Sequence, residues 1–194
     1  MIAADFRVFG AHFRPYYLLT LALLLSTGKA LALGVSIDAA STQNNKGVYQ
    51  LNADIRYELS EEVLEALNNG VAITMQLTIN IKRPRAYLWD KSIATLLQRY
   101  ALKYHALSGQ YIVQFLSSGK QRSYLSLASA LRALGRVREL PILNQTVIQV
   151  PPNAVVHLRS ELDTNALPAP LRPVAWLSRE WKLRSEWFTC PLKS

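Results

Sequence analysis

Histidine and cysteine, the side chains that most often bind zinc, are few and widely spaced in this 194-residue chain. Beyond the first 32 residues they are His105, His157 and the single cysteine, Cys190. No two of them have the short spacing of a zinc site, and no Gly-x-Ser-x-Gly motif marks a hydrolase nucleophile. The sequence therefore predicts no metal site, no cofactor and no nucleophilic catalytic residue.

Carboxylates beside tryptophans are a second pattern that could serve catalysis. Glu180 precedes Trp181 and Glu186 precedes Trp187, an arrangement suited to a cleft that stacks and cleaves sugars. With Asp163, these carboxylates could supply the acid and base of an envelope hydrolase acting on a cell-wall polymer. A strand with one apolar and one solvated face has the same pattern, and this second interpretation is favoured.

Basic side chains outnumber acidic ones, with 22 Lys and Arg against 13 Asp and Glu. Six residues are candidate contacts to an anionic partner: Lys82, Arg83, Arg85, Arg99, Lys103 and His105. The last three would share one face of a strand and form an electropositive stripe. A further basic group comprises Arg132, Arg136 and Arg138. The alternative is that these residues form solvated faces that aid solubility.

Aromatic side chains suggest a third function. Tyr100, Tyr104, Trp176 and Trp187 could line an interior pocket, as in a lipid or small-molecule carrier.

The first 32 residues have the pattern of a secretory leader. Arg7 and Arg14 precede an uncharged run over residues 15–28, whose apolar segment of about ten residues suits a signal peptide. Ala30 and Ala32 offer small side chains to a signal peptidase, so cleavage is expected after Ala32. The alternative is an uncleaved inner-membrane signal anchor, which Lys29 disfavours because a charge is costly within a bilayer. We expect a periplasmic protein with a cleaved signal peptide, 1–32, and a single β-rich domain, 33–194.

The expected export of the protein determines which partners its positive charge suggests. Residues 33–194 keep 19 basic and 12 acidic side chains, a net charge of +7. In an exported protein this charge favours an anionic lipid, a cell-wall polymer or an envelope or membrane protein as partner, and not nucleic acid. A lone cysteine permits no disulfide within the chain.

Period-two alternation of apolar residues predicts the elements that position these side chains. Strands are expected at 49–59, 71–81, 99–107, 111–116, 121–125, 146–150, 155–162 and 181–189. Short helices are expected after Ser60 and after Ser126, which are typical N-caps. The proline-rich run 168–173 is expected to form a structural corner. This order predicts a mainly β fold, an antiparallel β-sandwich or curled sheet with two short helices.

Three segments resemble a known family. Residues 99–111 (RYALKYHALSGQY), 166–173 (ALPAPLRP) and 181–187 (WKLRSEW) are similar to a proteobacterial exported family catalogued as domain of unknown function 4390. The family has no established activity, so the resemblance implies no catalytic or binding residue here. It implies an N-terminal leader and an accessory role in envelope signalling, linked to a membrane sensor kinase of the nitrogen-regulation type.

The favoured interpretation is a non-enzymatic binding or accessory module of the cell envelope that contacts its partner through a sheet face or edge. The envelope hydrolase and the carrier stay open as alternatives.

Overall fold

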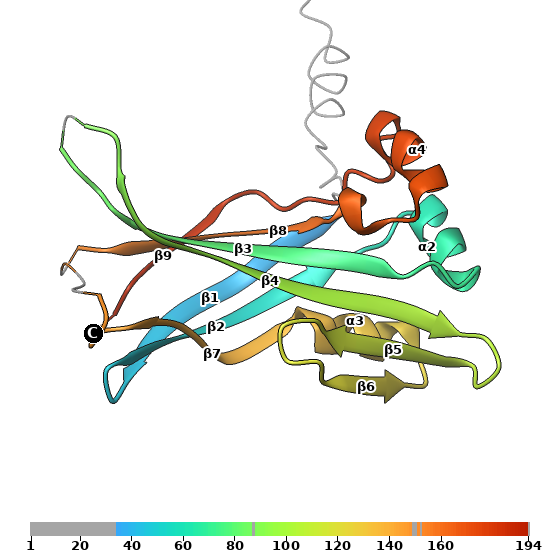
Figure 1. Ribbon diagram of the computed structural model, residues 1–194, viewed down its shortest axis with the longest axis horizontal. Coiled ribbons are helices and arrows are strands. Elements are labelled where there is room, and N and C mark those ends of the chain that lie inside the picture. The colour runs from blue at the N-terminus through green and yellow to red at the C-terminus, as the bar shows by residue number, and fades with distance from the viewer. Residues whose placement is uncertain (1–33, 87, 149–150, 152, 194) are drawn as a thin grey trace, which may run out of the picture. The chain divides into compact units, whose positions relative to one another are not determined.

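The computed structural model describes residues 34–86, 88–148, 151 and 153–193 (Figure 1). All of them belong to the second of two compact units into which the chain divides, Leu33–Ser194. The expected leader lies outside the described residues, so its cleavage stays a prediction. None of the helices among the described residues has the length and apolar character that spanning a bilayer requires.

Two antiparallel sheets form the body of this unit (Figure 1). The three-stranded sheet has the order β1 (Val35–Asn45), β2 (Val48–Tyr57), β7 (Arg136–Asn144). The six-stranded sheet has the order β6 (Gln121–Tyr124), β5 (Gln110–Phe115), β4 (Lys91–His105), β3 (Ile73–Arg83), β8 (Val155–Leu162), β9 (Phe188–Pro191). Neither sheet closes on itself, and the expected mainly β, sandwich-like class is confirmed.

The core lies between the sheets because each contributes one apolar face. In β2 the side chains from Tyr49 to Tyr57 are buried at every second position, and in β3 those from Ile73 to Ile81 are buried in the same way. The Tyr57 hydroxyl lies 2.9 Å from the Ser160 hydroxyl of β8 and joins the two faces by a buried hydrogen bond. On one side, the Thr42 hydroxyl of β1 donates to the Pro191 carbonyl and accepts from the Lys193 amide, both at 2.9 Å.

Both expected helices form where their caps predict. Ser60 accepts a hydrogen bond from the Val63 amide at the start of α2 (Glu61–Asn68), and Ser126 accepts one from Ser129 at the start of α3 (Leu127–Gly135). The proline-rich corner contains two 3-10 turns, η1 (Thr164–Ala166) and η2 (Ala169–Leu171), and a third short helix, α4 (Arg172–Leu177). Proline in the first turn of α4 suits its beginning.

Two expected strands are wrong in position. Residues 145–147 form a turn and Ile148 a bend, so 146–148 are no strand, while residues 149–150 lie outside the described residues. Within 181–189, Trp181, Leu183 and Ser185 are buried at period two as expected. This segment nevertheless has only one isolated backbone bridge to β8 among the described residues, Glu161 to Arg184, before β9 begins at Phe188. Burial at period two shows an extended chain here but not a hydrogen-bonded ladder.

Two strands were not expected from the sequence. Edge strand β1 buries only Val35 and Thr42 among its 11 residues, so it lacks an apolar alternation. In β7, register shifts against β2 and a proline at position 141 disturb the alternation.

Candidate functional site

The expected electropositive stripe lies on the outer face of β4. Arg99 Nε lies 3.4 Å from an Asp163 carboxylate oxygen and donates to Gln76 Oε1 at 3.1 Å. Lys103 is exposed, and His105 Nδ1 lies 3.0 Å from the Ser108 hydroxyl in the following turn. Part of the stripe is therefore already neutralised by a carboxylate of the same chain.

The other predicted basic group lies at the far end of the same hairpin. Lys82 and Arg83 end β3, and Arg85 follows in the connection to β4. In the β3–β4 ladder Arg83 pairs with Lys91, whereas Gln76 pairs with Arg99. At about 3.3 Å per residue, the two groups lie roughly 25 Å apart along β4. The structure thus brings the six predicted contacts together as two separate groups.

The histidine and cysteine positions show a structural role. No group of three His, Cys, Asp or Glu side chains suited to a metal ion occurs among the described residues. His157 Nδ1 lies 2.9 Å from the Thr189 hydroxyl of β9, and burial together with nearby Lys82 lowers the pKa of His157. Cys190 is buried, and burial raises the pKa of its thiol, the opposite of what an activated nucleophile requires.

The carboxylates proposed for a hydrolase do not meet. Asp163 binds Arg99 and also caps η1 by accepting a hydrogen bond from the Asn165 amide. Glu180 and Glu186 are exposed, and neither lines the main clefts of the described part of the chain.

The aromatic residues proposed for a carrier are likewise dispersed. Tyr100 is buried, and Tyr104 packs on Tyr111 with ring centroids 4.9 Å apart. Trp176 on α4 is exposed, and Trp187 lies beneath the Arg159 guanidinium, 4.5 Å from its ring centroid. The four side chains line no common cavity among the described clefts.

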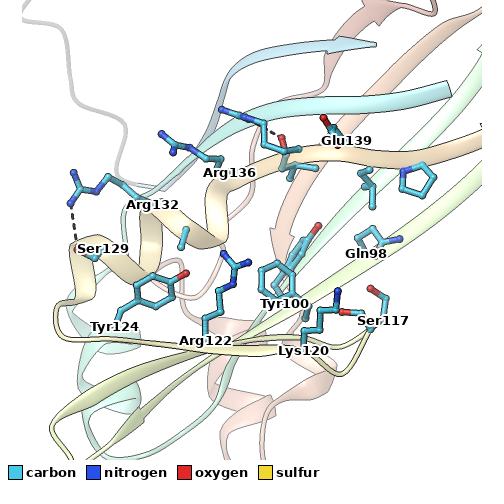
Figure 2. Close-up of a pocket in the computed structure, with 17 residues that line it drawn as sticks. Gln98, Tyr100, Ser117, Lys120, Arg122, Tyr124, Ser129, Arg132, Arg136 and Glu139 are labelled. Atoms are coloured by element: carbon cyan, nitrogen blue, oxygen red, sulfur yellow. Dashed lines mark hydrogen bonds between the residues drawn. The ribbon is translucent and has the colours of Figure 1, made fainter. Parts of the chain in front are cut away.

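A cleft of about 830 Å³ opens where the two sheets diverge (Figure 2). Strand β7 forms one wall, β4, β5 and β6 form the other, and α3 closes one end. The basic side chains that line it are Lys120, Arg122, Arg132, Arg136 and Arg138. We call it the basic cleft.

The path of the chain explains why residues of both sheets and of α3 line the same cleft. The chain leaves the six-stranded sheet at β6, passes through α3 and enters the three-stranded sheet at β7 without an intervening loop. Gly135 makes the junction possible, because a Cβ at this position would lie 1.9 Å from the Ile55 carbonyl oxygen of β2. Arg136 therefore begins β7 directly after the helix that carries Arg132.

Arg122 reaches the cleft because it lies on the inner face of the six-stranded sheet. It pairs with buried Val113 in the β5–β6 ladder, and Tyr124 pairs with Tyr111. Since directly paired residues share a face, Arg122 and Tyr124 point from edge strand β6 into the cleft, as Figure 2 shows.

The basic residues of the basic cleft differ in whether an acidic side chain pairs with them. Arg138 donates to the carbonyls of Ala53 and Val137 and binds Asp54 at 2.6 Å, so its charge is used within the fold. Among the described residues, no carboxylate lies within 4 Å of the charged nitrogens of the other four basic residues. Arg132 reaches only the Ser129 hydroxyl, at 3.5 Å. Four cations thus line the cleft with no carboxylate within 4 Å in the described chain, and two of them, Arg132 and Arg136, also border a second cleft that contains Asp38 and Asp54.

Glu139 is the one acidic side chain among the described residues that line the cleft. It has a φ of +50° at a bulge where the ladder shifts register between Leu51 and Ala53 of β2. Its amide donates to the Asn52 side chain at 3.0 Å. The left-handed backbone is a conformation that non-glycine residues adopt at some cost.

The floor of the cleft is aromatic. Tyr100 and Phe115 meet edge to face, with ring centroids 5.6 Å apart. Burial raises the pKa of Tyr100 to about 12, so its phenol stays protonated and can donate a hydrogen bond. Cations above an apolar floor can bind oxyanions, such as carboxylates or phosphates, in a partly desolvated setting.

The comparisons with known proteins decide the family. The model of the family described as Domain of unknown function (DUF4390) matches residues 32–191. The chain belongs to this family. No curated protein and no solved structure matches the chain.

Sequence reasoning missed two side chains of this DUF4390 domain, Lys120 and Arg122, as site residues. Arg132, Arg136 and Arg138 were noted as basic but were not assigned to a site. The sequence does contain a signal for Arg122. Pairing the expected strands 111–116 and 121–125 as a hairpin places Arg122 opposite Val113. An arginine that pairs with a core valine is expected at the border of the core-facing side of the sheet.

Proposed function

We propose that this DUF4390 domain is a non-enzymatic binding module of the cell envelope, exported to the periplasm by its N-terminal leader. Its basic cleft binds a carboxylate- or phosphate-bearing group of an envelope partner. The observation that carries the proposal is a group of four cations that line the cleft, Lys120, Arg122, Arg132 and Arg136, with no carboxylate within 4 Å of their charged nitrogens among the described residues.

Such a group differs from the solvated basic faces elsewhere on the domain. The four cations come from a turn, a strand, a helix and a second strand, and all four line one cleft. In Figure 2 Lys120 and Arg122 point into this cleft, whereas the charged ends of Arg132 and Arg136 point outward at its border. Like charges along one cleft repel one another, and an anionic occupant would offset this repulsion. By contrast, Arg99 already has Asp163, and Arg56 has Asp38 at 2.8 Å.

The cleft favours recognition by side chains over strand addition. β7 is an edge strand, and a bound peptide could in principle extend its sheet. The bulge at Glu139 and the missing amide hydrogen of Pro141 interrupt that edge, which is a common protection against strand pairing. The arginines offer charge-assisted hydrogen bonds instead.

Anion binding by charge-reversed variants tests the proposal. The probes are a fluorescein-labelled hexaglutamate peptide and inorganic tripolyphosphate, which separate carboxylate from phosphate recognition. The variant R122E/R136E is expected to weaken binding about tenfold or more, because two charge-assisted contacts become repulsive. Rising salt is expected to weaken binding to the unaltered protein as well.

The matched control is K103E/K182E, which reverses two exposed charges outside the cleft. It is expected to bind both probes nearly as well as the unaltered protein. Equal losses in both variants would show a nonspecific charge effect, and a loss in the control alone would place the site on the stripe of β4. Either result would refute the basic cleft as the binding site.

Export is tested separately. Fractionation and N-terminal sequencing of the accumulated protein are expected to find it in the periplasm, beginning at Leu33. A chain that begins at Met1 in the inner membrane would support the signal anchor instead.

A further inference from the structure

The connection between β3 and β4 carries two exposed apolar side chains that are adjacent in the sequence. Trp89 is 94% exposed and Leu88 is 66% exposed. Lys82 is the last residue of β3 with a partner in β8, so the hairpin beyond it has no third strand. Figure 1 shows this hairpin extending past its neighbours.

Cations flank these two side chains. Arg83, Arg85 and Lys91 line a shallow cleft beside the hairpin, together with Asn153, whose side chain reaches the Pro84 carbonyl. Among the described residues, no carboxylate lies within 4 Å of the charged nitrogens of these three. Asp90 is the one acidic residue in the sequence from Lys82 to Lys91.

We infer that this hairpin tip docks on the surface of an anionic lipid bilayer. Tryptophan prefers the interface between headgroups and acyl chains, where Trp89 and Leu88 would leave water. Arg83, Arg85 and Lys91 would lie at the level of the anionic headgroups. The proposal does not depend on the basic cleft, since the two sites share no residue.

A second exposed apolar surface suits an anionic bilayer less well. On α4, Val174, Trp176 and Leu177 are exposed. Its neighbours include acidic side chains: Ser178 donates to a Glu62 carboxylate oxygen at 3.1 Å, and Glu180 follows two residues later. Arg172 of this helix donates to the Leu167 carbonyl. Local carboxylates would be repelled by anionic headgroups.

Quenching of tryptophan fluorescence by acyl-brominated lipids tests the inference with the full chain. The vesicles contain equal parts of phosphatidylcholine and phosphatidylglycerol, with pure phosphatidylcholine as the neutral comparison. All four tryptophans lie at position 89 or later, so the N-terminal leader contributes no signal. The anionic vesicles are expected to quench part of the fluorescence of the unaltered protein.

Two conservative variants identify the tryptophan concerned. W89F is expected to remove the quenched component, while Phe still allows docking. W176F, the matched variant on α4, is expected to retain it. Quenching that persists in W89F, or that disappears in W176F, would overturn the inference.

The charge contribution is tested at the same tip. R83Q/R85Q is expected to weaken partitioning onto the anionic vesicles roughly 25-fold, at about fivefold per basic residue. K103Q/K182Q, with the same change in net charge, is expected to have a much smaller effect. Equal quenching by neutral and anionic vesicles would overturn the inference, as would no quenching at all, the result expected if the tip instead binds a protein.

Discussion

The hydroxyl oxygens of Tyr57 and Ser160 lie 2.9 Å apart, in a buried hydrogen bond that joins the three-stranded sheet to the six-stranded sheet. Both residues occupy inward positions of strands whose other inward side chains are apolar. Burial raises the pKa of Tyr57 well above its ordinary value, so the phenol remains neutral at ordinary pH. A polar pair at this depth contributes to stability only while both members are present.

A double-mutant cycle on this pair should therefore be non-additive. Tyr57→Phe and Ser160→Ala are each expected to lower the free energy of unfolding by about 1–2 kcal/mol, because each leaves the other hydroxyl unsatisfied. The double variant is expected to lose less than the two losses combined. Urea denaturation measures all three, and strict additivity would mean that the hydrogen bond contributes nothing.

The junction between α3 and β7 should tolerate no side chain. Gly135→Ala would place a Cβ against the Ile55 carbonyl, so we expect a loss of about 2–4 kcal/mol in the free energy of unfolding. Gly119→Ala is the comparison: its site is open, and only its φ of +68° opposes alanine, at about 1 kcal/mol. Thermal and urea unfolding would contradict the packing argument if Gly119→Ala proved the more damaging.

Stability should fall at alkaline pH. A tyrosine ionises near pH 10 in the unfolded chain, while burial raises the pKa of Tyr100 to about 12. The folded state therefore favours the neutral phenol: its contribution is complete below about pH 10 and is lost as the pH rises towards about 12. Tyr100→Phe is expected to make this loss shallower in urea denaturation across that range. An unchanged slope would contradict the assignment.

Glu139 offers a test that separates backbone strain from charge. Glu139→Gly removes the cost of the positive φ and is expected to stabilise the fold by up to about 1 kcal/mol. It also removes the acidic side chain of the basic cleft, so hexaglutamate should bind a few-fold more tightly. Glu139→Gln should share the tighter binding but not the added stability. If neither variant bound the peptide more tightly, Glu139 would not face the bound anion.

Much of the fold could be predicted because β2 and β3 each bury one whole face, which leaves a strict alternation in the sequence. Edge strand β1 buries two residues and β7 is bulged, so neither leaves that alternation. The two helices were predictable from the side chains of Ser60 and Ser126, which cap locally and need no tertiary partner.

The basic cleft could not be predicted in the same way. Its four cations lie within residues 120–136, but they border the same cleft only because α3 carries the chain from one sheet to the other. Sequence alternation assigns residues to a face of one strand and does not say which faces meet across a gap. The ion pair that neutralises Arg99 was equally invisible, because Asp163 follows a strand distant in sequence.

The hydroxyl of Thr42 is hydrogen-bonded to the Pro191 carbonyl and the Lys193 amide, and it thereby connects the two sheets where β1 lies beside β9. On the other side of the domain, β6 and β7 are separated by the basic cleft. A bulky ligand that widens the basic cleft would have to rotate the two sheets about the β1–β9 contact as a hinge. Covalent cross-links would then have different effects. A cross-link between β1 and β9 would still allow the basic cleft to widen, whereas a cross-link between β6 and β7 would prevent it from widening.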